Sequence, residues 1–417
     1  MLTGRLYFSD PWQKEFDAVV TGTKQDQSGY WISLSQSAFY PEGGGQPCDT
    51  GTLTGPNGEC RVREVQADQQ QEVWHRLEAR GDCPLPKTGD RVNGKIDWEQ
   101  RFDRMQQHTG EHILANCVFR IAGGYTHGLH IGQEVSSIDV TLPDHATRLP
   151  EEMLDQIEMM ANRRIAEDDP IVCRFPKKDE LPLLPLRKVP TVQEDVRVCM
   201  VGDYEMVACG GTHLARTSQV GQIKILYAEP ARGKTRVFFL CGLRAAAHYS
   251  QSYKALREAA NLLFCKQQEV PGRVGALLTS GADTRRELIA LRRLQTLSKA
   301  QGLLESAIPL PKGGRVIAAR LGPGDADAMD ELAAELVRNP GVIAILCAPR
   351  DQKTLCLFAR SEDREEDMKQ LLLSCGARGG GEPAFVRGAA GDPGVLDAAL
   401  NTLTHSSTLS GQKGAIP

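Results

Sequence analysis

The sequence lacks any run of apolar residues long enough to cross a membrane. A transmembrane helix needs about 20 consecutive apolar residues, and polar or charged residues interrupt this 417-residue chain at shorter intervals. The N-terminal segment also lacks an apolar stretch followed by small residues, the pattern of a secretory signal peptide. We therefore expect no membrane partner, no secretion and a cytoplasmic location.

Paired cysteines are missing as well. The chain has 12 cysteines, but they are scattered singly and no Cys-x-x-Cys pair occurs. Scattered cysteines in a chain long enough to bury a core are typical of reduced thiols, not of a disulfide framework. We expect most of them to be small core residues and one or two to be metal ligands.

An excess of one charge sign is also absent. Lys plus Arg number 49 and Asp plus Glu number 53, which gives a formal net charge of −4. This balance argues against a surface that binds polyanions everywhere, although it allows a local basic patch. The 41% hydrophobic and 24% charged residues are ordinary globular values, which exclude disorder. A chain of this length favours about two to four domains.

Hydrophobic patterning indicates where these domains lie. Residues 1–95 contain short β-rich stretches bounded by polar Gly, Pro and Asn turns, which favours a small β-barrel or sandwich. At Asp97 the apolar spacing becomes helical, and residues 96–243 combine two helices with strand-like stretches. We therefore expect a β-domain followed by a mixed α+β domain.

The second half of the chain predicts a linker and a last domain. Residues 244–305 predict a helical hairpin whose first helix runs to about Glu269 and is broken by Pro271-Gly272. The second helix carries several arginines. A solvated face is the simpler interpretation of these arginines, and a binding face is the alternative. Residues 306–417 predict a small α/β domain with a glycine-heavy loop. The predicted fold class is α+β multidomain.

The pattern with the clearest chemistry is His108-Thr-Gly-Glu-His112, inside a predicted helix. Residues at i and i+4 lie on one helical face about one turn apart, so both imidazoles can reach one metal ion. Cys209-Gly-Gly-Thr-His213 offers a thiolate and a third imidazole, and its glycines allow a tight turn. Either motif alone is usually accidental. Three His and one Cys together favour a zinc site.

The same helix contains His-x-x-Glu-His, the inverted zincin signature of some metallopeptidases. In that interpretation Glu111 is the general base and a downstream carboxylate is the third ligand. The pair Cys209 and His213 argues against a peptidase, because the thiolate would compete as a ligand. The peptidase is therefore a minor alternative.

Two glycine-rich stretches could contact a ligand. In the first, Gly43, Gly44 and Gly45 precede Gln46, whose amide can donate and accept hydrogen bonds, although a hairpin loop would suit these glycines equally. The second could place backbone amides and guanidinium groups on a sugar-phosphate backbone, although a flexible connection is the simpler interpretation. Its candidate RNA-binding residues are Arg378, Gly379, Gly380, Gly381 and Arg387.

These segments together resemble the AlaX family of trans-editing proteins, free-standing relatives of the editing domain of alanyl-tRNA synthetase. Five motifs match in the family's order across residues 38–247: FYPEGGGQPCDTG, RMQQHTGEHIL, HIGQEVSSIDV, ACGGTHLARTSQVGQIKIL and TRVFFLCGLRAA. The GARGGGEPAF stretch resembles the DHH-associated domain at the end of alanyl-tRNA synthetases. The resemblance to the long form of AlaX therefore covers nearly the whole chain.

The resemblance implies hydrolysis of the ester that joins a wrong amino acid, serine or alternatively glycine, to tRNA(Ala). It implies a Zn²⁺ cofactor bound by His108, His112, Cys209 and His213. It also implies a barrel of the translation-protein type at residues 1–95, an editing domain next to it, and a tRNA-binding domain at residues 306–417. No synthetase catalytic core is expected, so aminoacylation is not expected either.

Hydrolysis requires a water molecule at the ester carbonyl. Selection of serine over alanine requires a pocket whose polar groups form a hydrogen bond with the serine hydroxyl. Four protein donors fill a tetrahedral zinc site, so another group could position the water. Our candidates are Glu111, Gln46 and His130, of which His130 could equally be structural. Thr109 or Thr212 could recognise the serine hydroxyl. A non-catalytic tRNA-binding protein with a structural zinc is the alternative from another class.

A homodimer is a further possible partnership. Apolar residues on the first linker helix recur with a period of 3.5, which suits a partner helix in the same chain or in a second copy. These residues are Tyr249, Tyr253, Leu256, Ala260 and Leu263.

Overall fold

The computed structural model describes residues 2–81, 84–188 and 195–405, and all structural statements concern these residues. They form two compact units, Met1–Ala259 and Ala260–Pro417, which are described separately. Each unit has its own buried apolar clusters. The predicted α+β multidomain class is confirmed, and the finer division into four segments stays a prediction. No helix in the described part of the chain is long and apolar enough to span a membrane.

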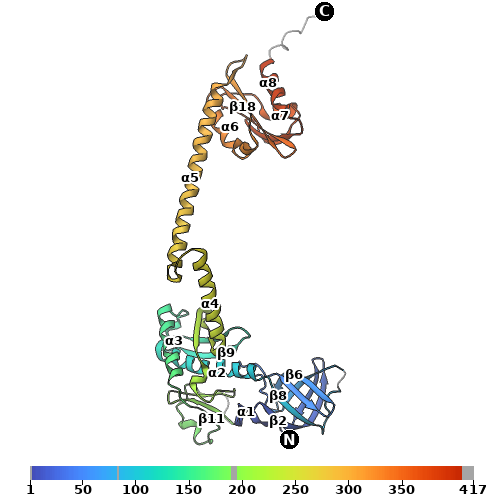
Figure 1. The fold of residues 1–417 in the computed structure, drawn as a ribbon, viewed down its shortest axis with the longest axis vertical. Coiled ribbons are helices and arrows are strands. Elements are labelled where there is room, and N and C mark those ends of the chain that lie inside the picture. Colours follow the sequence, from blue (N-terminus) through green and yellow to red (C-terminus); the bar gives the residue numbers. More distant parts are fainter. Residues whose placement is uncertain (1, 82–83, 189–194, 406–417) are drawn as a thin grey trace, which may run out of the picture. The chain divides into compact units, whose positions relative to one another are not determined.

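The first unit begins with a closed β-barrel, drawn in blue in Figure 1. Exposed and buried residues alternate along its first strand, where Phe16, Ala18 and Val20 are buried, as expected for a strand with one face in a core. The predicted barrel is confirmed. In barrel order its strands are β2 (Glu15–Asp26), β3 (Gly29–Leu34), β7 (Val73–Ala79), β6 (Gly58–Ala67), β5 (Gly51–Gly55) and β8 (Arg91–Ile96).

A long helix, α2 (Trp98–Ala122), follows the barrel and forms the centre of the rest of this unit. All of its residues from Met105 to Val118 are buried, because a second helix and two sheets pack around it. Gly123 ends the helix in the left-handed conformation, with φ of 64°. The elements around it are α3 (Glu151–Ala166), a sheet of β14 (Ile223–Ala231), β15 (Lys234–Cys241), β10 (Ser136–Thr141) and β9 (Tyr125–Ile131), and a sheet of β11 (Ile171–Arg174), β12 (Val198–Val201) and β13 (Glu205–Ala208).

A buried ion pair joins the barrel to α2. Arg101, which is 0% exposed, donates from Nε to Asp49 Oδ2 at 2.9 Å, and its other nitrogens donate to the carbonyl oxygens of Ala38 and Pro11. Asp49 in turn accepts from the backbone N–H of Tyr40 at 2.6 Å. These bonds fix both ends of the Gly43–Gln46 stretch beside the helix that carries the two histidines.

The two linker helices differ from the prediction at their junction. The first, α4 (Gly242–Leu262), ends well before Glu269, and the second, α5 (Val270–Glu305), already contains Pro271 in its first turn. Proline is tolerated there because the first N–H groups of a helix lack intrahelical partners. The break lies around Phe264, which has a positive φ of 50°. The predicted helix end and break point were therefore wrong.

The second unit contains a mixed sheet flanked by helices. The glycine-heavy stretch forms the paired strands β20 (Arg378–Glu382) and β21 (Phe385–Ala390), so the predicted loop was wrong. A Cβ at Gly379 would lie 1.9 Å from the carbonyl oxygen of Arg387, which shows that glycine permits this close pairing. In sheet order the strands are β16 (Ile308–Pro309), β17 (Arg315–Arg320), β18 (Val342–Arg350), β19 (Lys353–Arg360), β21 (Phe385–Ala390) and β20 (Arg378–Glu382), and the helices are α6 (Met329–Val337), α7 (Met368–Ser374) and α8 (Val395–His405).

Short elements complete the described structure. These are β1 (Gly4–Arg5), α1 (Leu6–Ser9), β4 (Gln36–Ser37), η1 (Pro143–His145), η2 (Leu181–Leu183), η3 (Thr217–Val220), η4 (Gln267–Glu269) and η5 (Pro323–Ala328).

Candidate metal centre

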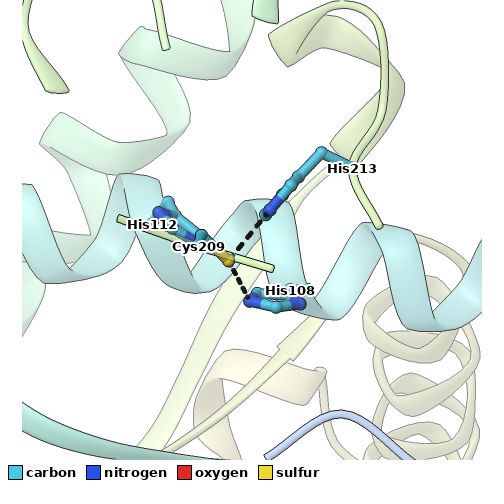
Figure 2. A group of neighbouring side chains, drawn as sticks. All are labelled: His108, His112, Cys209 and His213. Atoms are coloured by element: carbon cyan, nitrogen blue, oxygen red, sulfur yellow. Dashed lines mark hydrogen bonds between the residues drawn. The ribbon is translucent and has the colours of Figure 1, made fainter. Parts of the chain in front are cut away.

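Four buried or half-buried side chains converge in the first unit, as Figure 2 shows. His108 and His112 come from successive turns of α2, and their rings stack with centroids 5.2 Å apart. Cys209 and His213 come from the loop that follows β13, about a hundred residues further along the chain. The sulfur of Cys209 lies 3.3 Å from His108 Nε2 and 3.2 Å from His213 Nε2. One donor atom from each of the four residues lies within 4.8 Å of the others.

The loop of Cys209 and His213 reaches this position because of its glycines. A Cβ at Gly211 would lie 2.1 Å from His108 Cε1, whereas a Cβ at Gly210 would meet nothing within 4 Å. Arg197 supports the loop by donating to the carbonyl oxygens of Cys209 and Gly211 at 3.2 and 2.8 Å. The tight turn predicted from the sequence thus depends on Gly211 in particular.

Polar side chains behind the histidines fix their orientation. Gln46 is fully buried, and its Oε1 accepts from His108 Nδ1 at 2.8 Å and from the backbone N–H of Thr212 at 3.1 Å. Its Nε2 donates to Thr212 Oγ1 at 2.8 Å. Thr109 Oγ1 lies 3.4 Å from His213 Nδ1. Because Nδ1 of His108 donates to Gln46, its Nε2 is left free to coordinate a metal.

The donor set fits a zinc ion. Burial lowers the pKa of His108 to about 3 and holds the pKa values of His112 and His213 well below their usual range, so all three imidazoles stay in the neutral, metal-binding form. Burial raises the pKa of Cys209 to about 12, and a nearby cation would favour its thiolate. His112 Nδ1 is buried without a hydrogen-bond partner among the described residues. Neutral imidazoles and one sulfur are donors that Zn²⁺ prefers.

A cavity of about 580 Å³ opens beside this group and is lined by His108, His112 and Cys209. Among the described residues of its wall, Glu111 is the one carboxylate. Burial raises the pKa of Glu111 to about 7, against the opposing effect of Arg187. The remaining wall residues are Tyr40, Gly43, Gly44, Gly45, Thr126, His127, Gly128, Leu129, Arg187, Lys188, Val207, Ala208, Gly210 and Gly211.

The structure places several predicted residues away from this cavity. His130 is exposed and does not line it; its neighbour His127 does. Thr109 and Thr212 are 0% exposed and lie behind the histidines, and Gln46 also lies behind them. These positions make Gln46 and Thr109 positioning residues for the ligands and leave neither threonine free to meet a substrate.

Sequence reasoning missed the polar residues on the opposite wall. Thr126 Oγ1 accepts from Arg187 Nη1 at 3.0 Å, while Arg187 Nε donates to the buried Glu205 at 2.8 Å. Lys188 lies beside Arg187 at the exposed rim. No spacing pattern links Thr126 to residues some sixty positions later, so only the fold brings them together.

The glycine loop of the first unit forms one edge of the cavity. Gly43 and Gln46 exchange backbone hydrogen bonds, and Gly45 accepts from Ile131 N at 3.1 Å. Gly45 has φ of 84°, and a Cβ there would lie 1.9 Å from the carbonyl oxygen of Leu129. The loop therefore packs against β9 through a position that only glycine can fill.

The predicted RNA-binding residues lie in the second unit. Arg378, Gly380 and their neighbours form the exposed edge strand β20. Arg387 on β21 forms an ion pair with Asp330, although its side chain remains 64% exposed. No described feature tests whether these residues contact RNA, so this role stays a prediction.

Family models match two parts of the chain. Residues 12–100 match the tRNA synthetases class II (A), and residues 196–238 match the threonyl and alanyl tRNA synthetase second additional domain. The first match covers the barrel, and the second contains Cys209 and His213.

Curated relatives match a larger share of the chain. The alanyl-tRNA editing protein AlaX-L of Pyrococcus horikoshii is 28% identical over 408 residues, which cover 96% of this chain and 98% of that protein. The alanine–tRNA ligase of Pyrococcus abyssi is 31% identical, and the match covers 91% of this chain but 41% of the ligase. The ligase of Halorubrum lacusprofundi is 29% identical, with 96% of this chain and 43% of the ligase covered. The resemblance to the AlaX family is therefore confirmed.

A solved structure also matches. The C-Ala domain from Aquifex aeolicus alanyl-tRNA synthetase covers 24% of this chain and 94% of that chain, at 13% identity and a TM-score of 0.22. A score this low supports no structural argument.

Proposed function

We propose that this chain, which resembles the AlaX family of alanyl-tRNA editing proteins along nearly its whole length, is a deacylase that hydrolyses Ser-tRNA(Ala) and, as a second substrate, Gly-tRNA(Ala). The observation that carries the proposal is the convergence of His108, His112, Cys209 and His213 beside a cavity that contains a buried carboxylate. The wall residues 40–45, 108–112 and 208–211 lie within the motifs that this chain shares with the family, which supports an editing site.

In this proposal the four converging residues hold Zn²⁺. A zinc ion held there supplies a Lewis-acidic positive charge at the wall of the cavity. Gln46 keeps the Nδ1 proton of His108 in place, and Thr109 does the same for His213. Because four protein donors fill a tetrahedral zinc site, the proton of the attacking water requires a different group.

Glu111 is suited to that task. Its carboxyl group lines the cavity and is only 7% exposed, so it can accept a proton from water and return it to the leaving 3′ oxygen of the ribose. The substrate is an ester, which needs less leaving-group assistance than the amide of a peptidase substrate. His130 is not needed in this scheme, because it lies outside the cavity wall.

Thr126 is the residue we propose for recognition of the serine hydroxyl, in place of Thr109 and Thr212. Its Oγ1 already accepts from Arg187, which leaves its own hydroxyl hydrogen to donate to a substrate oxygen. Alanine offers no such oxygen and would leave this buried donor unpaired. A site of this kind rejects the substrate that lacks the hydroxyl far better than a purely apolar pocket could.

The proposed partner is tRNA(Ala), held at two places. Arg187 and Lys188 line the cavity near the position of the acceptor end, and the exposed arginines of α5 and β20 offer guanidinium groups to the phosphate backbone. A cytoplasmic location and a homodimer through the exposed Tyr249, Tyr253 and Leu256 belong to this proposal as well.

The decisive experiment is a deacylation assay on the full chain with Ser-tRNA(Ala), Gly-tRNA(Ala) and Ala-tRNA(Ala), each with labelled amino acid. We expect release of serine and sparing of alanine, a loss of activity in Glu111→Gln, and inhibition by a zinc chelator that added Zn²⁺ reverses. Binding of tRNA without release of any amino acid would instead favour a non-catalytic tRNA-binding protein with structural zinc, which the four-donor set also suits. Cleavage of a peptide panel would favour the HxxEH metallopeptidase.

A further inference from the structure

Two cysteines that take no part in the proposed metal centre face each other behind it. Cys173 on β11 lies directly opposite Cys199 on β12 in an antiparallel register. Their sulfur atoms lie within 4.8 Å of each other and of a ring nitrogen of His213. Neither residue lines the cavity.

The hydrogen bonding of the two strands brings the thiols close. Gly202 N donates to Pro170 O at 3.0 Å, so residues 170 and 202 form a hydrogen-bonded pair of the ladder. Hydrogen-bonded and non-hydrogen-bonded pairs alternate, which makes the Cys173–Cys199 pair, three steps away, a non-hydrogen-bonded one. The Cα atoms of such pairs are about 4.5 Å apart, within the range of 4.4–6.8 Å that a disulfide requires.

The two thiols differ in access to solvent. Cys173 is half-buried, whereas Cys199 is 0% exposed. A small oxidant can therefore reach Cys173 first, and Cys199 is placed to attack the oxidised sulfur. This is the arrangement of an attacked thiol and a resolving thiol.

We propose that Cys173 and Cys199 form a reversible intramolecular disulfide when the protein meets a peroxide. The Cys173 thiolate attacks the O–O bond of hydrogen peroxide, which yields a sulfenic acid at Cys173 and, after protonation, one water. Cys199 then attacks that sulfur; the S–S bond forms, the S–O bond breaks and a second water leaves. Two thiols lose two electrons, the peroxide gains them, and a dithiol reductant reverses the change by exchange.

The disulfide would act on the strands that hold the metal-binding loop. Ile171 N on β11 donates to Ala215 O at 2.8 Å, two residues after His213. Arg197, which directly precedes β12, donates to the carbonyl oxygens of Cys209 and Gly211. Oxidation of this pair therefore changes the two strands that hold the loop of Cys209 and His213. It leaves the four proposed metal ligands unmodified.

The second unit offers a matched control. Cys347 on β18 and Cys356 on β19 also lie directly opposite each other, and their sulfur atoms are 3.7 Å apart. Ser361 N donates to Val342 O, which makes this pair non-hydrogen-bonded by the same alternation. Both residues are buried, at 3% and 2% exposure. The register is equivalent, whereas access for the oxidant differs.

The test treats the full, zinc-loaded chain with low concentrations of hydrogen peroxide, quenches with an alkylating reagent and maps disulfides by mass spectrometry. We expect a Cys173–Cys199 linkage in most chains, no Cys347–Cys356 linkage, an unchanged zinc content and full reversal by dithiothreitol. In Cys199→Ser, Cys173 should accumulate sulfinic acid instead, whereas Cys356→Ser should leave the Cys173–Cys199 linkage unchanged.

Three outcomes would overturn the proposal: no Cys173–Cys199 linkage in the folded protein, equal oxidation of both pairs, or oxidation of Cys209 first. Loss of zinc from untreated Cys173→Ser or Cys199→Ser would also overturn it, because these thiols would then be metal ligands. The mapping needs no substrate, so its result is independent of the proposed deacylase activity.

Discussion

The position of the His108 ring in the candidate metal centre depends on the absence of a Cβ atom at Gly211. A Cβ added there would lie 2.1 Å from His108 Cε1 and 2.4 Å from His108 Nδ1, so the imidazole would have to move off its Gln46 partner. We expect Gly211→Ala to weaken zinc binding by about 10- to 100-fold, the range typical when the support of a ligand is disturbed.

Gly210→Ala is the matched control, because a Cβ at Gly210 meets nothing within 4 Å. Zinc affinities of both variants are measured by competition with a chromophoric chelator. Equal affinities for the two variants would show that His108 can shift without loss of the ion.

His75 gives the barrel a pH-dependent stability. Its ring is fully buried, lies 2.7 Å from Ser37 Oγ through Nε2, and burial lowers its pKa from 6.5 to about 4. Below pH 6.5 the unfolded chain binds a proton at His75 that the folded chain does not. The contribution of neutral His75 is therefore complete above that pH and is lost as the pH falls toward 4, at up to about 1.4 kcal/mol per pH unit.

The measurement is denaturant unfolding between pH 7 and 4 for the wild type and His75→Gln, whose amide keeps a hydrogen-bonding group but cannot titrate. The variant should start less stable and lose less free energy of unfolding as the pH falls. Identical pH slopes would mean that His75 is not the group responsible.

At the scale of residues, the sequence predicted which donor side chains converge better than it predicted the residues that surround them. His108 and His112 share a helical face by their spacing alone, and the Cys-Gly-Gly-Thr-His pattern keeps its two donors within one turn of loop. Thr126 and Arg187 meet in the cavity wall only because β9 and the segment after η2 are folded against each other. No local periodicity encodes such a contact, which is why the sequence pointed to Thr109 and Thr212 instead.

At the scale of elements, the joint between the barrel and α2 depends on Arg101 and Asp49. Both side chains are almost completely buried, at 0% and 1% exposure, and Asp49 Oδ1 already lacks a hydrogen-bond partner in the described structure. Removal of the guanidinium leaves this buried carboxylate with the more distant Arg104, whose Nη1 lies 3.7 Å from Asp49 Oδ1, as its remaining cationic partner. We expect Arg101→Met to lower the free energy of unfolding by about 3–5 kcal/mol.

The double variant Arg101→Met/Asp49→Asn separates loss of the pair from loss of the charge. It should recover a large part of the lost stability, because the buried negative charge is removed as well. Equilibrium unfolding in urea compares the three proteins. A double variant that is no more stable than the single one would show that the hydrogen bonds to Ala38 and Pro11 matter more than the charge pair.

Elements with a strong period were predicted, and elements defined by glycine were not. The helix beginning near Asp97 and the alternating strand β2 follow their apolar spacing closely. The strand β5, with the sequence GTLTG, and the strand β20, with RGGGE, carry little apolar signal. Their pairing is imposed by close approach of neighbouring strands, as at Gly379, and glycine in a sequence predicts a turn at least as readily as such an approach.

At the scale of the whole molecule, the chain contains two compact units, each with its own buried core. The first unit holds the candidate metal centre, and every described residue of the cavity wall belongs to it; the second unit has its own sheet and buried clusters. Predicting several domains was possible because the patterning changes along the chain. The sequence could not show that α4 ends before Cys265 or where the second compact unit begins.

The last prediction concerns the arginines of α5, for which the sequence left a solvated face and a binding face open. Arg292 and Arg293 are exposed on this helix, whereas Lys299 on the same helix is already paired with Asp325. If the helix contacts the phosphates of tRNA, Arg292→Gln/Arg293→Gln should weaken tRNA binding and reduce the slope of log K against log salt by about 0.7–0.9 per lost contact. Turnover of saturating substrate should stay unchanged, because neither residue lines the cavity.

A control with the same change of charge is Arg63→Gln/Arg80→Gln in the barrel, where both side chains are at least half exposed. Fluorescence anisotropy with labelled tRNA(Ala) at several salt concentrations gives both slopes. A smaller slope for the α5 variant alone assigns the helix to RNA binding. Equal slopes for the two variants would mean that the arginines of α5 serve only to solvate a long exposed helix, and that contacts of the tRNA with this chain lie elsewhere.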